Sequence, residues 1–328
     1  MFRASLAIEA APCLVHRPQC VVVWRFAKLF QVLTHDILPI FSMMALGFMM
    51  GRFQVVSKME ATTLNRIAFL FLQPALIFPL VNGVDLTAFQ FDGIALYGLA
   101  QLVVFGAAVL VCLYVFKCTL IESWLLAMTT VFVNSLLYIW PISLLMYGVD
   151  GNLPIKAIVV WDATFTFAFF IITTDLLVNR GQSAGKSLMR LAKNPVLVAI
   201  ALGMCTNALG LKTPEPVLTA FKFAGAGAAP LTLFALGVFL SAHGVVPTTK
   251  ITAFTAIKLF VFPLVVAAFL YIGERPDAWN DMLLLNAAGP AGAMAFALAV
   301  LHGVRTDTIA PVIIWTSLLT LFSLAWLA

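Results

Sequence analysis

Residues 132–144 read Phe-Val-Asn-Ser-Leu-Leu-Tyr-Ile-Trp-Pro-Ile-Ser-Leu, which places an amide and a helix breaker seven residues apart in an otherwise apolar stretch. Pro141 has no N–H to donate to the carbonyl of Leu137, and its ring crowds that turn, so an unbroken α-helix is unfavourable. Inside a membrane the freed carbonyl would find no water. The carboxamide of Asn134 both donates and accepts hydrogen bonds. The stretch therefore predicts either a kinked helix whose Asn satisfies the backbone or a broken helix that binds a ligand.

The composition predicts an all-α membrane protein. Of 328 residues, 62% are hydrophobic and 10% charged, and the mean hydropathy of +1.05 exceeds what a soluble domain can bury. The net charge of +5 comes from basic residues near segment ends, which is typical of orientation in a bilayer and not of nucleic-acid binding. Five cysteines and four histidines lack metal-site spacing, and phosphate-loop and hydrolase motifs do not occur. We therefore expect no metal, no cofactor, no nucleic-acid partner and no enzymatic activity.

The apolar residues fall into ten segments from residue 33 onward, each long enough to cross a ~30 Å hydrocarbon layer at about 1.5 Å per residue. They cover residues 33–51, 62–81, 93–116, 123–147, 155–178, 194–210, 217–242, 251–272, 280–301 and 307–327.

The longest polar connection, residues 179–193, contains four basic residues and no acid, so the positive-inside tendency places it in the cytoplasm. It separates a first five-helix unit (31–178) from a second (194–328) and puts both termini outside the cell (inner) membrane. Residues 1–30 form no convincing span and are basic on the outer side, so we expect this N-terminal extension to be absent from the mature protein.

An internal repeat relates the two units. A shift of 156 residues superimposes Pro39 on Pro195, Gly47 on Gly203, Pro74 on Pro230 and Asn134 on Pro290. Because Pro and Gly punctuate helices, similar breaks are expected at similar depths. Five spans per unit is an odd number, so the second unit must enter the membrane from the opposite face, which is the inverted-repeat arrangement of transporters.

The repeat partner of the opening stretch is residues 285–299, Leu-Asn-Ala-Ala-Gly-Pro-Ala-Gly-Ala-Met-Ala-Phe-Ala-Leu-Ala. Pro290 predicts a second broken helix, and Gly289 and Gly292 allow another backbone to approach closely. If the fourth and ninth helices cross at their breaks, half-helix N-termini and unpaired carbonyls meet there, with Asn134 and Asn286 beside them. Such a place suits a carboxylate. The alternative, that small residues only permit tight packing, stays open.

The sequence resembles the auxin efflux carrier family, which includes plant PIN carriers and bacterial malonate- or malate-type transporters, from Leu33 to Leu327. The likeness rests on Asn134 with Pro141, Gly289-Pro290-Ala291-Gly292, Leu64-Asn65-Arg66 followed by Pro74, Lys193-Asn194-Pro195, and Leu233-Phe234-Ala235-Leu236-Gly237. The resemblance implies ten helices in two inverted five-helix repeats, a scaffold part, a moving transport part, and a substrate carboxylate held where helices four and nine cross. It assigns Asn134, Pro141 and Pro290 to that crossing.

Three features depart from the family pattern. Val133 stands where plant members have a proline, the long central loop of many plant members is reduced to about 15 residues, and Asp162 follows Trp161 where plant members tend to have an aromatic residue.

Two charges lie inside predicted spans. Asp162 is about eight residues into the fifth span, where a carboxylate must be paired or protonated. It is a candidate proton carrier or, alternatively, a structural partner of a neighbouring Thr or Lys. Lys258, about two turns into the eighth span, either attracts an anionic substrate or extends to the membrane surface, and the second interpretation is slightly favoured.

Together these observations predict a secondary active transporter of small organic anions, with Asn134, Pro141, Asn286, Gly289, Pro290 and Gly292 at the substrate and Asp162 and Lys258 in coupling. Proton or sodium coupling, contact with membrane lipid and a homodimer fit this prediction. An anion channel and a non-transporting membrane receptor remain as alternatives.

Overall fold

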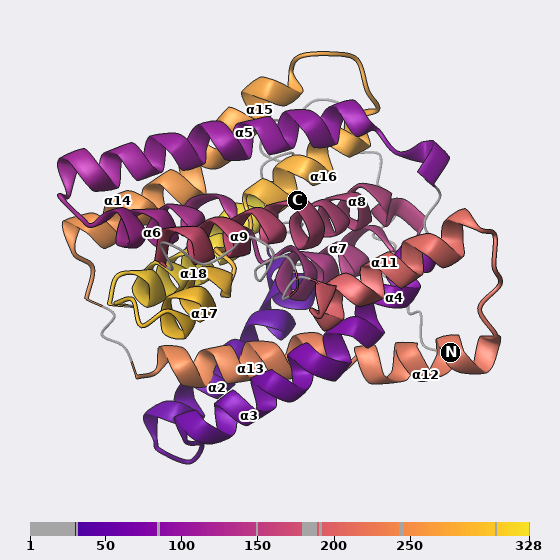
Figure 1. Ribbon diagram of the computed structural model, residues 1–328, viewed down its shortest axis with the longest axis horizontal. Coiled ribbons are helices and arrows are strands. Elements are labelled where there is room, and N and C mark those ends of the chain that lie inside the picture. Colours follow the sequence, from indigo (N-terminus) through magenta and orange to yellow (C-terminus); the bar gives the residue numbers. More distant parts are fainter. Residues whose placement is uncertain are drawn as a thin grey trace, which may run out of the picture.

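The computed structural model describes residues 30, 32–83, 86–148, 150–178, 189, 192–242, 246–305 and 307–327, and these residues form helices and no multi-residue strand (Figure 1). The expectations for residues 1–29 and for most of the 179–193 connection lie outside the described residues.

Helices occupy every apolar segment that the sequence predicts. In chain order they are η1 (Val32–Ile37), α2 (Leu38–Arg52), α3 (Lys58–Ile67), η2 (Ala68–Leu72), α4 (Gln73–Asn82), η3 (Leu86–Ala88), α5 (Phe91–Leu110), η4 (Val111–Val115), α6 (Leu120–Val131), η5 (Ser135–Ile139), α7 (Trp140–Tyr147), η6 (Asp150–Asn152), α8 (Leu153–Trp161), η7 (Asp162–Thr166), α9 (Phe167–Val178), α11 (Pro195–Ala208), α12 (Glu215–Gly225), α13 (Ala228–Leu240), α14 (Thr249–Ala256), η8 (Ile257–Val261), α15 (Phe262–Leu270), α16 (Asp277–Ala287), α17 (Met294–Leu301) and α18 (Ile309–Leu327).

Several of these elements join into continuous helices of membrane length. Five are apolar and have 22 to 26 residues, namely Lys58–Asn82, Phe91–Val115, Leu153–Val178, Glu215–Leu240 and Thr249–Leu270. At about 1.5 Å per residue each exceeds the ~30 Å hydrocarbon core. The protein is therefore a multi-pass, all-helical membrane protein.

Three prolines lie just after π-helical turns of the same length. Pro74, Pro141 and Pro263 each take the second position of a helix (α4, α7 and α15) that follows a five-residue π-helical turn. A π-helical turn hydrogen-bonds each N–H to the carbonyl five residues earlier, which makes room for a ring that lacks an N–H. The expectation that Pro141 marks the break in its helix is therefore wrong, because the chain continues helically from Ser135 through Pro141 to Tyr147.

Helix α2 packs against α13 with its backbone in direct contact, and α3 also packs against α13 (Figure 1). Glycines make this contact feasible. A Cβ atom at Gly47 would collide with the carbonyl of Phe234, and one at Gly237 would collide with the carbonyl of Met44. Close approach of this kind is typical of membrane helices, where small residues let backbones meet.

A second pair, α4 and α11, is built in the same way. A Cβ atom at Gly203 of α11 would lie 3.1 Å from the carbonyl oxygen of Phe78 and 3.1 Å from the Cβ of Val81. Helix α12 also packs against α4. The remaining helices form the other side of the molecule, where α5 runs beside α15 (Figure 1).

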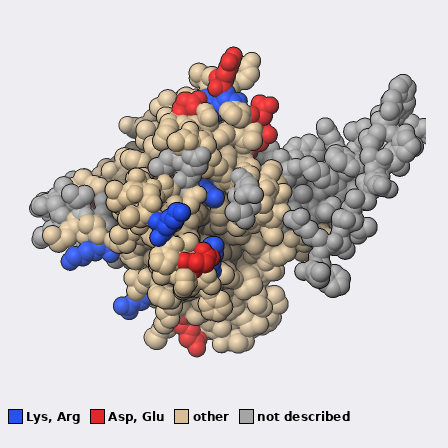
Figure 2. Space-filling view, turned by 90° about the vertical axis from the view of Figure 1, so that its right-hand side faces the viewer, with Lys and Arg blue, Asp and Glu red and all other residues tan. Residues whose placement is uncertain are grey.

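The surface carries few charges. On the face shown in Figure 2, Lys, Arg, Asp and Glu form small separate patches among uncharged residues. Large apolar side chains on the long helices point outward, including Leu102 on α5, Phe165 on η7 and Leu264 on α15. This distribution is what a lipid-facing surface requires.

Candidate functional site

The site is formed by two helix interruptions. Helix α6 ends at Val131, and the chain resumes as helix at Ser135. In the second unit α16 ends at Ala287, and α17 begins at Met294. We call residues 132–134 and 288–293 together the crossover.

The two interruptions contact each other through their backbones. Val133 and Ala291 form an isolated antiparallel bridge. The amide of Asn134 donates to the carbonyl of Pro290 at 3.0 Å, and the amide of Gly292 donates to the carbonyl of Phe132 at 2.8 Å. Backbone groups that no longer belong to a helix are thus satisfied by the other interruption, which is a requirement at membrane depth.

The glycines of the crossover are needed for this approach. A Cβ atom on Gly289 would lie 2.6 Å from Cδ1 of Ile139, and one on Gly292 would lie 2.7 Å from a ring carbon of Phe132. Helix α18 supports the crossover from behind, because the hydroxyl of Thr316 accepts the Ala291 amide at 3.2 Å. Pro290, which has no N–H, contributes only its carbonyl.

The helix ends give the crossover a defined polarity. Two helical segments, η5–α7 and α17, begin at the crossover, and two others, α6 and α16, end there. The first N–H groups of a helix have no acceptor inside it and carry partial positive charge, whereas the last carbonyls carry partial negative charge. A carboxylate is favoured at the N-termini of such helices and a cation at their C-termini.

Asn134 lies directly before η5 and is half-buried. Its carboxamide makes no hydrogen bond to any residue that the structure describes, and it does not cap η5. The sequence left open whether this side chain satisfies the backbone. The structure instead leaves its donors and acceptor available at the N-terminus of a helix.

Asp162 lies behind the crossover, buried at 3% exposure. Its carboxylate accepts hydrogen bonds from the amide of Gln101 at 2.9 Å, the hydroxyl of Ser135 at 2.9 Å and the hydroxyl of Thr166 at 3.2 Å. Ser135 is the first residue of η5, so the carboxylate is hydrogen-bonded to the residue that directly follows the crossover. Both interpretations of Asp162, proton carrier and structural partner, are compatible with this arrangement.

Gln101 of α5 links this carboxylate to its surroundings. Its amide also donates to the carbonyl of Val131, the last residue of α6, at 3.3 Å, and its carbonyl accepts the indole N–H of Trp161 at 2.9 Å. The indole ring of Trp161 packs directly against Gly98, where a Cβ atom would collide with it. Sequence reasoning missed Gln101, although a glutamine in the middle of an apolar span is a signal that could have found it.

Lys258 is fully buried and does not extend to the membrane surface, so the favoured interpretation from the sequence is wrong. Its ammonium donates to the carbonyl of Ala287 at 2.7 Å and lies 4.8 Å from the ring centre of Phe262. A cation at the C-terminal residue of α16 is stabilised by the carbonyls that end the helix. Lys258 also lies close enough to Asp162 for the two charges to interact.

Asn286 occupies the last turn of α16 and is fully buried. Its amide donates to the hydroxyl of Tyr97 at 2.8 Å, whereas its side-chain oxygen has no partner among the described residues. The structure thus brings Asn134, Asn286, Gly289, Pro290 and Gly292 together in or beside the crossover. It leaves Pro141 in α7, beyond the π-helical turn and outside the interruption.

A cavity of about 490 Å³ borders this region between α5 and the α8–η7–α9 helix. Its lining is mostly apolar, and its polar part consists of groups from the Asp162 network, Gln101, Thr166 and Trp161. Phe165 and Phe170 also line it, and Phe165 is exposed at the surface whereas Phe170 is buried in the packing.

Comparison with known proteins places this geometry in context. The model of a family described as "Membrane transport protein" matches residues 32–184 and 180–327. The chain is similar to an "Uncharacterized transporter" of Methanothermobacter thermautotrophicus, with 24% identity over 302 residues that cover 90% of this chain and 97% of the relative. It is also similar to a "Putative malonate transporter" of Rhizobium meliloti, with 24% identity over 302 residues that cover 88% of this chain and 92% of the relative.

Proposed function

This chain belongs to the auxin efflux carrier family of membrane transport proteins, and we propose that it is a secondary transporter that moves a small organic anion across the membrane by alternating access. One observation carries the proposal. The carboxamide of Asn134, which has no partner among the described residues, lies at the N-terminus of η5 where the two helix interruptions meet. A carboxylate placed there would gain the amide of Asn134 and the unpaired N–H groups of the helix.

The proposal includes ten membrane crossings in two inverted five-helix repeats. Two features of the packing support it. A shift of 156 residues carries the interruption at 132–134 onto 288–290, and it carries α2 onto α11 and α4 onto α13. If the two units are exchanged, the contact between α2 and α13 corresponds to a contact between α11 and α4. The molecule contains both contacts. Packing that exchanges partners in this way is expected of two units related by a pseudo-two-fold axis.

The proposed topology places both termini outside the cell membrane and the 179–193 connection in the cytoplasm. Its basis is the excess of Lys and Arg in the connections on one side. The charges described in and near the crossover do not determine orientation, because they are buried.

We assign Asp162 the coupling role in this proposal. The titratable groups that face it are Lys258 of η8 and Tyr97 of α5, and its hydrogen-bond donors are neutral. The Asp162 carboxylate is hydrogen-bonded to the first residue of η5. When it takes up a proton, the charge beside the proposed substrate site changes. Protonation of Asp162 and anion binding at Asn134 would then be linked.

A ligand screen tests the proposal directly. Thermal unfolding of the purified protein is followed with a panel of carboxylates, beginning with malonate because one relative carries that name. A ligand that binds only the folded state raises the unfolding midpoint. Carboxylates that do so are then offered as labelled substrates to proteoliposomes. Saturable uptake is the expected result. Binding without uptake would instead favour a receptor, and a conductance beyond carrier turnover would favour a channel.

A further inference from the structure

A pair of cysteines lies where the α5–η4 helix ends, away from the crossover. Cys112, in η4, is buried, and Cys118, in the connection to α6, is half-buried. The connection folds back on the helix, because the amide of Cys118 donates to the carbonyl of Cys112 at 3.2 Å. The two residues therefore lie side by side.

The backbone between them is held in an unusual conformation. Lys117 has a φ of +54°, in the left-handed region that residues with a Cβ atom rarely adopt. This turn directs Cys118 toward the last turn of η4. The Cys112 thiol is close enough to interact with the Cys118 thiol and with the hydroxyl of Ser123.

A lysine from the second half of the chain completes the cluster. The ammonium of Lys250, in the first turn of α14, lies 3.1 Å from Sγ of Cys118. At this distance the ammonium can form an ion pair with the thiolate, which is the nucleophilic form of cysteine. Cys205 of α11 is exposed and has no such neighbour among the described residues, so it serves as an internal reference.

We propose that Cys118 is a peroxide-reactive thiol that forms a disulfide with Cys112. The Cys118 thiolate attacks one oxygen of hydrogen peroxide, the O–O bond breaks, and the leaving hydroxide takes a proton to become water. The sulfur is oxidised by two electrons to a sulfenic acid while the peroxide is reduced. The Cys112 thiol then attacks that sulfur, the S–O bond breaks, and the thiol proton leaves with the hydroxide as a second water. This inference does not depend on the transport proposal.

Peptide mass spectrometry of peroxide-treated protein tests the disulfide. Trypsin cleaves after Lys117, so the peptides that contain Cys112 and Cys118 remain joined only when a disulfide links them. We expect a joined pair that is 2 Da lighter than the sum of the two separate peptides and that separates on reduction. In Cys112→Ser we expect a sulfenic acid on Cys118 that dimedone traps. Two separate, reduced peptides after treatment of the native chain would overturn the proposal.

The role of Lys250 is tested by the rate at which Cys118 is alkylated by iodoacetamide. Lys250→Met removes the ammonium and keeps an apolar chain, and we expect Cys118 to react about tenfold more slowly while Cys205 is unaffected. Lys250→Arg keeps the charge and should retain most of the native rate. An unchanged rate in Lys250→Met would contradict activation by the ammonium, and equal slowing at Cys205 would show a general effect on the fold.

Discussion

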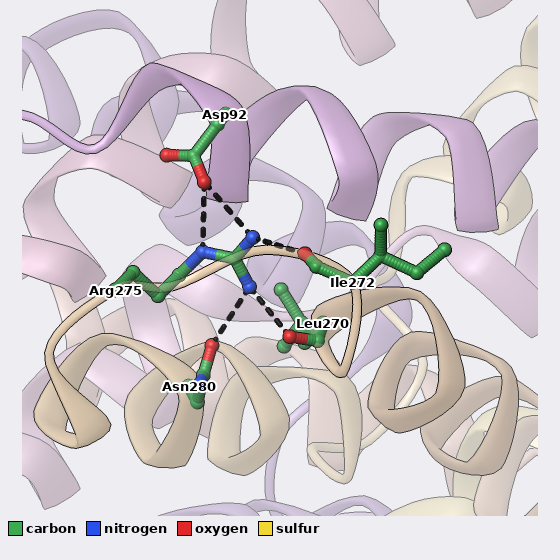
Figure 3. A network of polar contacts seen from close by, with 5 residues as sticks. All are labelled: Asp92, Leu270, Ile272, Arg275 and Asn280. Atoms are coloured by element: carbon green, nitrogen blue, oxygen red, sulfur yellow. Dashed lines mark hydrogen bonds and ion pairs between the residues drawn. The ribbon is translucent and has the colours of Figure 1, made fainter.

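Two polar centres of this molecule differ in how completely their polar groups are hydrogen-bonded. The first is the cluster around Arg275, at the end of the α5–α15–α16 layer (Figure 3). Its guanidinium donates to the carboxylate of Asp92 at 2.9 and 3.0 Å, to the carbonyls of Leu270 and Ile272 at 2.7 Å each, and to Asn280 at 3.0 Å. The arginine side chain is fully buried in these contacts.

The crossover is incomplete by comparison. The Asn134 carboxamide has no partner among the described residues, and the side-chain oxygen of Asn286 is buried without one. A buried polar atom without a partner is unfavourable by roughly 1–3 kcal/mol, so a ligand group that pairs with it would bind more tightly. The Arg275 cluster is satisfied by groups of the chain itself and stabilises the fold, whereas we propose that a bound carboxylate satisfies the unpaired groups of the crossover.

The largest expected effect is on stability, at the satisfied centre. Arg275→Met removes the guanidinium that supplies the hydrogen bonds of the cluster. The carbonyl of Leu270, a residue that is 2% exposed, then loses its hydrogen-bond donor. We expect the free energy of unfolding to fall by about 3 kcal/mol. The variant leaves a buried carbonyl without a hydrogen bond, and it removes the contacts that join α5, α15 and α16. Chemical unfolding in detergent measures this loss. Carboxylate affinity, measured where the variant is folded, should remain within about twofold of the native value.

The next largest effect is on affinity, at the open centre. Asn134→Ala removes a carboxamide that makes no hydrogen bond to a described residue, so the unfolding midpoint without ligand should not fall. Binding of the carboxylate found in the ligand screen should weaken by roughly tenfold or more, since a hydrogen bond to a charged group contributes about 1.5–3 kcal/mol. Isothermal calorimetry measures the affinity. Native affinity in Asn134→Ala, or weakened affinity in Arg275→Met, would remove the distinction between the two centres.

A smaller effect is expected at the carboxylate behind the crossover. Asp162→Asn keeps the shape of the side chain but cannot exchange a proton, so uptake should lose its dependence on pH. Proteoliposome uptake at a series of pH values measures this. Asp175→Asn is the matched control, because Asp175 is a second buried acid on the same continuous helix and contacts His302 at 3.1 Å. If pH dependence persists in Asp162→Asn and disappears in the control, the coupling role belongs to Asp175.

The sequence predicts the crossover better than it predicts the surroundings of the crossover. Gly289, Pro290 and Gly292 can be identified from sequence because helix breakers and small residues act locally, through a missing N–H or a missing Cβ atom. The position of the first break cannot be identified so easily. The sequence assigns it to Pro141, but a π-helical turn accommodates that proline, and the chain leaves the helix at residues 132–134, where Val133 pairs with Ala291 across the molecule.

The partners of the buried charges depend on packing between distant segments. Gln101 and Asp162 are 61 residues apart, and Lys258 donates to a carbonyl 29 residues away. Apolar periodicity does not specify which faces of two membrane helices meet, since lipid and protein are equally apolar surroundings. The sequence therefore marks Asp162, Lys258 and Gln101 as unusual residues, whereas their partners, and the roles of Ser135 and Tyr97, follow only from the three-dimensional structure.

The smallest expected effect is at the exposed edge of the Arg275 cluster. Asp92→Asn removes the charge of a carboxylate that is 51% exposed but keeps an oxygen that can accept from Arg275. Solvent screens such a pair, so we expect the free energy of unfolding to change by less than about 1 kcal/mol, and the difference from native should shrink further in high salt. Chemical unfolding at two salt concentrations measures both. A loss as large as that of Arg275→Met would mean that the ion pair, and not the two carbonyls and Asn280, holds the cluster together. The Arg275 cluster would then be held by one exposed ion pair. In that case the two centres would differ in their charges and not in how many of their polar groups are hydrogen-bonded.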